Sequence, residues 1–349
     1  MAQTLKVRLE DGEKAKQFLM KKGWLDTTKV VGHTAQRYLI FALNSNFKAN
    51  ILEKQFPGSK IENKTLPVLP EKMGDLKHTL SKVIPHEYVN DVIRSFDTVG
   101  DIAILQIPPK LENFKLQIAH ALKRTQPSLK VIARKIGKVG SKNELYRLTK
   151  LEILTGEQRF TTVHKEHGVT MKIDLDNAYF SPKSSNERLR VAKLTKLEEN
   201  VLVMFAGVGP SALVISEFQP NCHIWAVEIN PIASELLKEN VRLNRAGNIT
   251  VISGDVLKEV PKLGILFDRI VMPYPERNWE FLNLAIENTA PQGVIHFYAF
   301  AKEDELKETI KKIEDAAKDI GKSIEILDWT KAGSYAPKTW RYVFDIRVI

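Results

Sequence analysis

Over residues 174–349, stretches typical of strands alternate with stretches typical of helices. Short apolar runs rich in Val and Ile, such as residues 201–206, 223–230 and 267–273, are separated by segments of helical period. This alternation predicts a doubly wound, mostly parallel sheet with helices on both faces. Two terminal extended runs, the second over residues 340–349, predict an antiparallel strand at one end of the sheet. In such an open α/β domain a ligand binds beyond the carboxyl ends of the strands.

The first half of the chain is predicted to form two smaller domains. Residues 1–56 have the pattern strand, helix, strand, with Asp11 expected to cap the helix. Residues 57–74 are rich in Pro, Gly and Lys, which favours a linker. Residues 75–173 then predict an α+β middle domain, closed by a pair of strands within residues 161–175. The whole chain is therefore expected to hold three domains.

Positive charge is concentrated upstream of the predicted parallel sheet. The net charge is +10, and residues 101–150 hold 11 Lys and Arg against 3 Asp and Glu, or +8. Residues 201–349 hold 17 against 20, or −3. A basic middle domain is either a solvated face or a surface for a polyanion, most simply a nucleic acid. The candidate phosphate contacts are Lys123, Arg124, Lys130, Arg134, Lys135, Lys138 and Lys142.

The cysteine content and the apolar runs exclude several classes of protein. Cys222 is the only cysteine, so neither a disulfide framework nor a cysteine-rich zinc cluster can form within the chain, and no metal is expected. No apolar run approaches the ~20 residues that a membrane-spanning helix needs. The first residues are charged and lack an apolar signal core. A cytoplasmic protein without a membrane partner is the expectation.

The predicted strand ends indicate a nucleoside-binding site. Gly207 and Gly209 permit a tight turn after the first strand, and Glu228 ends the second strand, where a carboxylate can accept hydrogen bonds from ribose hydroxyls. Asp255 follows the third strand, where it could meet an adenine amino group. Together these ends match S-adenosylmethionine-dependent methyltransferases better than nicotinamide enzymes; turn and capping roles are the alternative. The predicted cofactor contacts are Phe205, Ala206, Gly207, Val208, Gly209, Glu228, Ile229, Asn230, Asp255, Val256 and Met272.

Six stretches resemble one known family, and the resemblance extends over essentially the whole chain. They are SFDTVGDIAIL (95–105), ELYRLTKLEILTGE (144–157), YFSPKSSNER (179–188), MFAGVGP (204–210), VEINP (227–231) and DRIVMPYP (268–275). The chain resembles the archaeal and eukaryotic tRNA (guanine-37-N1)-methyltransferases. The resemblance implies a class I methyltransferase domain that uses S-adenosylmethionine. It also implies a middle domain beside the tRNA anticodon loop and an N-terminal domain that checks the tRNA elbow. A monomer is the expectation.

Methylating N1 of guanine requires a base that removes the N1 proton, and a carboxylate within hydrogen-bond reach is a natural candidate. Glu187 is that candidate and also matches the base proposed for the family. The alternative is a capping box with Ser184, because Ser-x-x-Glu opens the predicted helix there. Arg188, beside it, could hold a phosphate or orient Glu187. Arg147, on a predicted strand, matches the family arginine that steadies the guanine carbonyl oxygen; one such donor contributes roughly 3 kcal/mol. An ordinary arginine on a strand face is the alternative.

The remaining predicted substrate contacts surround the flipped base. Tyr179, Phe180, Ser181 and Pro182 form a clamp whose apolar members could stack on the base or, equally, pack as core. Pro273, Tyr274 and Pro275 form a stiff corner with two N–H groups removed, and this corner is expected to be a wall of the base pocket.

Two residues depart from the common pattern of the family. Val203 stands where the family usually has an aspartate that helps orient the cofactor, which puts that contact in doubt. Pro273 stands where the family usually has an asparagine. The resemblance implies that a proline at this position marks a bifunctional archaeal branch. That branch also methylates C7 of the tricyclic wyosine precursor imG2. An aminocarboxypropyl transferase of the same pathway and a non-catalytic RNA-binding protein are the alternative functions.

Overall fold

The computed structural model describes residues 2–26, 29, 31–34, 38–67, 76–93, 96–137, 145–336 and 338–349. The chain divides into two compact units, residues 1–82 with 124–126 and residues 83–123 with 127–349. Lys138 and Lys142, two of the predicted phosphate contacts, lie outside the described residues. Within the described residues, no helix is both long enough and apolar enough to cross a lipid bilayer.

The N-terminal unit contains an antiparallel sheet of strand order β2-β3-β1-β4. Its elements are β1 (Ala2–Arg8), η1 (Leu9–Asp11), α1 (Gly12–Lys21), β2 (Gly32–His33), β3 (Tyr38–Ala42), α2 (Ala49–Gln55), β4 (Lys60–Lys64) and α3 (Leu76–Leu80). Asp11 occupies the N-cap position of α1 but makes no side-chain capping bond. The linker predicted over residues 57–74 starts too early, because β4 lies within that range and pairs with β1. The polar composition of β4 hid this edge strand.

The second unit begins with a four-stranded sheet of order β5-β6-β7-β8. Its elements are η2 (His86–Tyr88), α4 (Val89–Ile93), β5 (Phe96–Val99), β6 (Ile102–Leu105), η3 (Pro109–Phe114), α5 (Lys115–Thr125), β7 (Val131–Ile136) and β8 (Lys150–Gly156). Strands β6 and β7 are parallel, and the other two pairs are antiparallel. The mixed sheet confirms the α+β character predicted for this region.

A separate hairpin, β9 (Thr161–Glu166) and β10 (Val169–Asp174), follows this sheet. Its inward residues Val169, Met171 and Ile173 belong to the same apolar core as the parallel sheet of the C-terminal domain. The main chain of β10 also bonds to α8 (Pro231–Leu243), since the Lys172 N–H donates to Asn240 at 2.7 Å. This core also contains Val99, Ile102 and Val131 of the middle sheet, and the Thr162 hydroxyl donates to Asp101 at 2.8 Å, so the hairpin packs on both domains. That it closes the middle domain stays a prediction. The alternating pattern predicted the strands correctly but could not show which core they join.

The C-terminal domain is the predicted doubly wound sheet, with strand order β13-β12-β11-β14-β15-β17-β16 and β17 antiparallel to both neighbours. Its strands are β11 (Asn200–Val203), β12 (His223–Glu228), β13 (Ile249–Ser253), β14 (Phe267–Met272), β15 (Thr289–Lys302), β16 (Ile324–Ala336) and β17 (Thr339–Val348). Its helices are η4 (Pro182–Ser184), α6 (Ser185–Leu194), α7 (Pro210–Phe218), α8, α9 (Val256–Glu259), η5 (Pro261–Leu263), η6 (Asn278–Phe281), α10 (Leu282–Glu287), η7 (Glu303–Glu305) and α11 (Leu306–Asp319).

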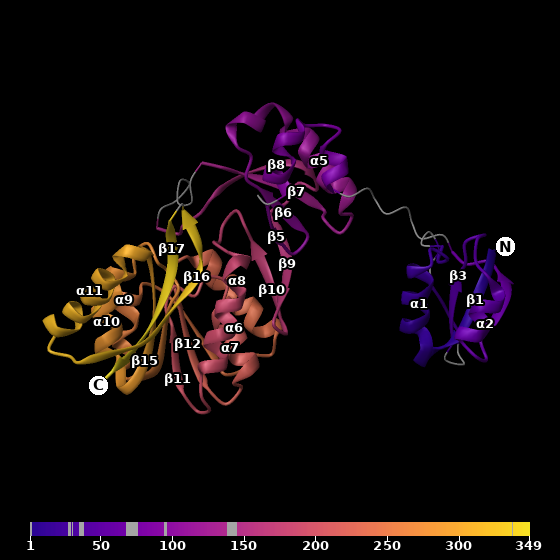
Figure 1. Cartoon of the computed structure of the whole chain (residues 1–349). Coiled ribbons are helices and arrows are strands. Elements are labelled where there is room, and N and C mark those ends of the chain that lie inside the picture. Colours follow the sequence, from indigo (N-terminus) through magenta and orange to yellow (C-terminus); the bar gives the residue numbers. More distant parts are fainter. Residues whose placement is uncertain are drawn as a thin grey trace. The chain divides into compact units, whose positions relative to one another are not determined.

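Helices cover both faces of this sheet (Figure 1). An apolar core lies between the sheet and the helices on each face. Alternate residues of β11 point to opposite sides: Val201 and Val203 pack with α6, α7 and α8, whereas Leu202 packs with α10 and α11. Because both faces are covered, the parallel strands are almost continuously apolar. The turns that follow β11, β12 and β14 lie together at the carboxyl edge of the sheet.

Candidate active site

A cavity of about 930 Å³, including the open space at its mouth, lies at the carboxyl ends of β11, β12 and β14. The predicted residues that line it are Arg147, Tyr179, Phe180, Ser181, Arg188, Phe205, Ala206, Gly207, Glu228, Ile229, Asn230, Pro273 and Tyr274. Residues from the cofactor set and from the substrate set thus share one cavity. The other predicted contacts that lie outside its lining are Pro182, Glu187, Val208, Gly209, Asp255, Val256, Met272 and Pro275.

The turn after β11 brings the main chain to the cavity. Phe205, Gly207 and Gly209 all have positive φ, at 53°, 58° and 94°. Gly209 is required for packing, because an added Cβ would lie 2.2 Å from Leu237 Cδ1. Over Gly207, an added Cβ would meet only the Tyr179 carbonyl, at 3.7 Å, so a ligand can approach the backbone there. Phe205 adopts a conformation that costs a non-glycine residue about 1 kcal/mol or more, and its ring packs on Tyr274 and Phe281.

Glu228 ends β12 as a buried carboxylate held by the main chain. Its Oε2 accepts the Gly207 N–H at 2.7 Å and its Oε1 accepts the Asn230 N–H at 2.8 Å. Burial raises the pKa of Glu228, and backbone donors at Asn230, Gly207 and Ile229 oppose that effect. Asn230 caps α8 through the N–H groups of Ile232 and Ala233. The result is a fixed acceptor at the cavity, with lone pairs left for a vicinal diol such as that of ribose.

One predicted polar contact for the cofactor, Asp255, lies outside the cavity lining, and Val203 supplies no acidic group in place of the family's usual aspartate. Asp255 caps α9 by accepting the Leu257 N–H at 3.0 Å, and its role toward an adenine stays a prediction. Val203 is fully buried in the core between the sheet and its helices, so no acidic group lies at that position. Met272 and Val256 are also buried in the core and not part of the cavity wall.

Arg147 lies in a turn before β8 with a φ of 55°, so the prediction that it lies on a strand is wrong. Its guanidinium lies 4.1 Å from the centre of the Tyr179 ring and 5.2 Å from that of Tyr274. Its Nη2 donates to Glu276 Oε1 at 2.7 Å, while its buried Nε has no protein partner among the described residues. Arg147 thus joins the two tyrosines into one cationic wall. Sequence inspection missed Glu276, whose only signal was its place directly after the corner.

The proline corner follows β14. The Tyr274 N–H donates to the Met272 carbonyl at 2.9 Å, which closes a tight turn. The Tyr274 side chain is largely buried against Phe205, and its ring borders the cavity. The amide of Asn278 donates to the carbonyls of Met272 and Tyr298, which ties the corner to β15. Pro273 lines the cavity, whereas Pro275 does not.

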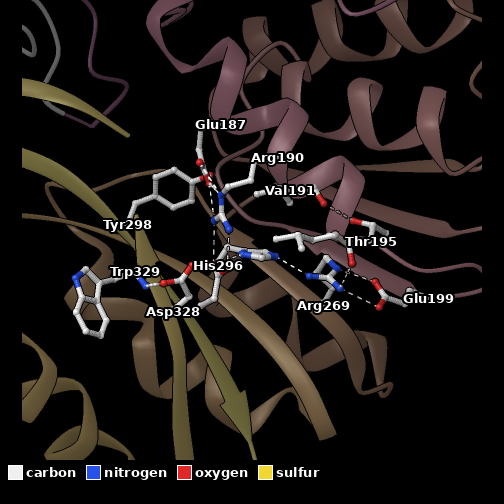
Figure 2. Close-up of polar contacts among 12 residues, drawn as sticks. Glu187, Arg190, Val191, Thr195, Glu199, Arg269, His296, Tyr298, Asp328 and Trp329 are labelled. Atoms are coloured by element: carbon white, nitrogen blue, oxygen red, sulfur yellow. Dashed lines mark hydrogen bonds and ion pairs between the residues drawn. The ribbon is translucent and has the colours of Figure 1, made fainter. Parts of the chain in front are cut away.

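Glu187 lies in the first turn of α6 and is 5% exposed (Figure 2). Ser184 makes no side-chain capping bond, so the capping-box alternative is wrong. Instead, Glu187 binds the guanidinium of Arg190 through two oxygens, with Nη2–Oε1 and Nε–Oε2 distances of 2.8 and 2.9 Å. Tyr298, which lines the cavity, donates its hydroxyl to Glu187 at 3.3 Å. Glu187 is therefore connected to the cavity through Tyr298 and does not form its wall.

Arg188 does not orient Glu187 and is not free to hold a phosphate. It is 6% exposed and forms a two-pronged pair with Glu166, at 2.6 and 2.7 Å. It also donates to the Ser181 carbonyl at 3.3 Å. Burial by itself would raise the pKa of Glu166, but hydrogen bonds from His164 and Arg188 outweigh it and lower that pKa to about 2. Arg188 therefore ties the β9–β10 hairpin to the loop before α6.

The predicted clamp is split between cavity and core. Tyr179 is half-buried on the cavity wall. Phe180 is mostly buried and packs on the His164 ring, with 5.0 Å between the ring centres. Pro182 begins η4 and borders a separate hollow together with Lys135. Of the clamp residues, Tyr179 is thus the aromatic side chain with most surface to offer a base.

The basic residues of the middle domain are less free than their sequence suggests. Arg134 is bound to both Glu112 and Glu152, so its guanidinium is already occupied by carboxylates. Lys135 is half-buried, and burial lowers the pKa of its amine. Arg124 and Lys130, in contrast, have exposed side chains. The prediction of Arg134 as a phosphate contact is therefore wrong in this arrangement, because a phosphate would have to displace two carboxylates.

Comparison with known proteins identifies the family of this chain. A family model described as the TRM5/TYW2 methyltransferase domain matches residues 162–327, and one described as the TYW2 N-terminal domain matches residues 76–159. The chain is 30% identical over 351 residues to the tRNA (guanine(37)-N(1))-methyltransferase Trm5b of Pyrococcus abyssi, which covers 100% of this chain and 99% of the relative.

Two further similarities concern substrate and fold. The chain is 28% identical over 305 residues to the tRNA (guanine(37)-N(1))/4-demethylwyosine(37)-methyltransferase Taw22 of Nanoarchaeum equitans, covering 73% of this chain and 100% of the relative. The solved structure of the complex of aTrm5 and tRNALeu matches with a TM-score of 0.72 and 28% identity over 99% of both chains. The chain therefore belongs to the TRM5/TYW2 methyltransferase family.

Proposed function

We propose that this protein transfers a methyl group from S-adenosylmethionine to N1 of guanosine 37 in the tRNA anticodon loop. The observation that supports this best is the shared cavity. One side presents Gly207 and the Glu228 carboxylate, which suit a nucleoside cofactor. The other side presents Arg147, Tyr179 and Tyr274, which suit a flat, electron-rich base.

The residues present fit S-adenosylmethionine as the cofactor. The open backbone at Gly207 leaves room for a ligand, and the fixed carboxylate of Glu228 is placed for ribose hydroxyls. The N-terminus of α7 begins with Pro210 at the same cavity, which adds a favourable dipole for a carboxylate group. When bound, S-adenosylmethionine supplies an electrophilic methyl group. Val203 provides no acidic contact, so the cofactor's amino group needs another partner.

The protein side chains have three tasks in this reaction. Arg147 holds the carbonyl oxygen of guanine, where negative charge builds as N1 loses its proton. Glu187 takes the N1 proton, and N1 gains the methyl group in exchange, so the base leaves as neutral 1-methylguanine. Tyr179 and Tyr274 supply stacking surface for the extruded base. The hydroxyl of Tyr298 links Glu187 to the cavity.

We also propose that the same cavity accepts the tricyclic base named in the Taw22 relative. That name gives 4-demethylwyosine as the substrate, so it replaces imG2 as the expected precursor. Pro273 supports this wider specificity, because a proline at the cavity wall presents no amide to a guanine edge. A wall of Pro273 and Tyr274 leaves an apolar surface for a third ring.

The two alternative functions are less well supported. An aminocarboxypropyl transferase is expected to lack most of the N-terminal domain, whereas Trm5b matches this chain over its entire length. A non-catalytic RNA-binding protein needs no buried Glu187 beside a cofactor-sized cavity. We further expect the protein to act as a monomer, with the middle domain beside the anticodon loop and the N-terminal unit at the tRNA elbow.

One experiment tests the proposal and its substrate range. Purified protein and labelled S-adenosylmethionine are incubated with transcripts that carry either guanosine or 4-demethylwyosine at position 37, and the modified nucleosides are identified by mass spectrometry. Label in 1-methylguanosine and in a C7-methylated tricyclic nucleoside is expected. Label in 1-methylguanosine alone would show that the protein does not methylate the tricyclic base. Label in neither nucleoside would overturn the proposed function. Transfer of the aminocarboxypropyl group would favour the alternative.

A further inference from the structure

A continuous series of charged and polar side chains extends from Glu187 into the protein (Figure 2). Arg190 Nη1 donates to Asp345 Oδ2 at 2.6 Å, and Asp345 Oδ1 lies 2.7 Å from His296 Nδ1. On the far side of His296, Arg269 Nη1 lies 2.7 Å from Nε2 and Arg269 Nε donates to Glu199 at 2.7 Å. We call this series the ionic network. Its members are Glu187, Arg190, Asp345, His296, Arg269 and Glu199.

The contacts of His296 fix its charge. A guanidinium can only donate hydrogen bonds, so Nε2 of His296 must accept from Arg269 and cannot hold a proton. Nδ1 then holds the proton and donates it to Asp345. The ring is fully buried, and burial lowers the pKa of His296 although Asp345 opposes that effect. His296 is therefore neutral.

The ionic network consequently has one more negative than positive group. Its charged members are three carboxylates and two guanidiniums, because His296 is neutral. Tyr298 is neutral as well: burial, and then the charge of Glu187, raise the pKa of its hydroxyl well above the ordinary value. Arg190 is shared between two acids, since it binds both Glu187 and Asp345. A proton that arrives at Glu187 would make the ionic network neutral.

The other charged groups around the network leave this count in place. Arg188 is paired with Glu166, and Arg341, on the cavity wall, donates to the Ala332 carbonyl and to no carboxylate of the network. The charged groups that border the solvent end of the network are Lys196, Glu198, Asp268 and Arg347. These last groups line an open hollow, where solvent screens them from Glu187.

We propose that Asp345, acting through Arg190, is a positioning residue that keeps Glu187 correctly oriented and basic enough to take the N1 proton. This inference rests on the proposed function. A carboxylate paired with one guanidinium is a weak base, because protonation strands the positive partner in a buried place. When Asp345 shares Arg190, protonation of Glu187 leaves an Arg190–Asp345 pair that is already satisfied. The proton is then accepted without leaving a buried charge alone.

The test is the pH dependence of single-turnover methyl transfer to the guanosine-37 transcript, measured from pH 5 to pH 9 at saturating tRNA and S-adenosylmethionine. Asp345→Asn keeps an acceptor for Arg190 but removes the negative charge. We expect its plateau rate to fall about tenfold and its acid limb to move to lower pH by about one unit. Binding of tRNA and of S-adenosylmethionine is expected to stay within about threefold of the wild type, since Asp345 does not line the cavity.

Two further variants test the direction in which the acid limb moves. Arg190→Gln removes the positive charge between the two acids, so its acid limb is expected to move to higher pH, opposite to that of Asp345→Asn. Asp345→Glu keeps the charge and is expected to leave the limb at its wild-type position. Glu325→Gln is the matched control, because it removes a carboxylate from an exposed ion pair with Arg347 on the neighbouring strand.

Each outcome decides for or against the proposal. The proposal is overturned if the acid limbs of Asp345→Asn and Arg190→Gln move in the same direction. It is also overturned if Asp345→Asn and Asp345→Glu have the same acid limb. If Asp345→Asn does not fold, an unmoved limb in Arg190→Gln is sufficient to reject it. A wild-type enzyme without activity on either transcript would refute the proposed function itself, whereas an active wild type with unmoved limbs refutes only the inference.

Discussion

Glu187 is separated from the cavity by Tyr298, so its basicity is set by protein groups on both sides. Arg190 holds both of its oxygens, and Tyr298 donates to one of them. A buried carboxylate with these donors is held in one orientation. For a base this arrangement matters because the proton must arrive along a defined line. It also means that removal of the carboxylate changes chemistry more than binding.

At the level of this residue we predict that Glu187→Gln lowers the single-turnover rate of methyl transfer about 100-fold or more. The amide keeps the size of the side chain but cannot take the N1 proton. Rates are measured with saturating cofactor, and tRNA affinity is measured separately by filter binding. Glu239→Gln is the control, since Glu239 pairs with Lys172 near the surface. Equal losses of rate and of tRNA affinity would contradict the role of Glu187 as the base.

A second residue-level prediction concerns substrate choice at Pro273. Pro273→Asn introduces an amide at the cavity wall that can bond to the guanine edge but crowds a third ring. We expect the ratio of kcat/KM for 4-demethylwyosine to that for guanosine to fall roughly fivefold, the effect of one hydrogen bond of about 1 kcal/mol. Pro275→Asn, outside the cavity lining, is the matched control. If the two substrates respond alike, Pro273 does not set specificity.

Some site residues could be identified from sequence and others could not, for a physical reason. Gly207, Glu228 and Asn230 follow strands that the apolar pattern locates, so their place at the carboxyl edge was predictable. Asp345 lies 158 residues after Glu187 in the chain, and the two carboxylates are connected because Arg190 binds both. No local spacing signals such a contact. Likewise, the guanidinium of Arg147 contacts Tyr179, Tyr274 and Glu276, which are all distant from it in the sequence, so its local sequence does not signal these contacts.

At the scale of elements, the β9–β10 hairpin is joined to α6 by one buried ion pair. Glu166 comes from β9 and Arg188 from α6, and both side chains are about 5% exposed. Arg188 also holds the Ser181 carbonyl, so the pair fixes the loop that presents Tyr179 to the cavity. The boundary predicted at residue 173 missed this, because strand patterning shows pairing within a hairpin but not the element on which the hairpin packs.

The Glu166–Arg188 pair predicts a pH-dependent part of the stability. The pKa of Glu166 is lowered from 4.5 to about 2, so the stabilisation is complete above pH 4.5 and is lost as pH falls toward 2. We expect Glu166→Gln to lower the free energy of unfolding by about 3 kcal/mol at pH 7 and by roughly half of that at pH 3. Urea unfolding followed by tryptophan fluorescence measures both values.

The matched control for this pair is Glu157→Gln, because Glu157 forms a more exposed pair with Arg159. An exposed pair contributes about 0–1 kcal/mol, so little change is expected at either pH. A loss in Glu166→Gln that is equally large at pH 3 and at pH 7 would show that packing, and not the ionised carboxylate, joins the hairpin to α6.

At the scale of the whole molecule, charge is divided between regions that have different tasks. The parallel sheet and its helices are slightly acidic, at −3 over residues 201–349, whereas residues 101–150 have a charge of +8. Such a division directs a polyanion toward the middle domain and away from the outer helices. The structure narrows the set of contributing side chains, because Arg134 is neutralised by two acids while Arg124 and Lys130 are exposed.

We therefore predict that the double variant Arg124→Glu and Lys130→Glu weakens tRNA binding and flattens its salt dependence. Each phosphate contact contributes a slope of about −0.7 to −0.9 to log K against log salt, so loss of two contacts should flatten the slope by about 1.5. Filter binding between 50 and 300 mM KCl measures it. The matched control is Lys311→Glu with Lys318→Glu on the outer helix α11, which changes the net charge equally. If both double variants flatten the salt slope alike, only net charge matters and the middle domain is not the tRNA-binding surface. If the slope is unchanged in the Arg124→Glu and Lys130→Glu variant, these two residues are not part of the tRNA-binding surface.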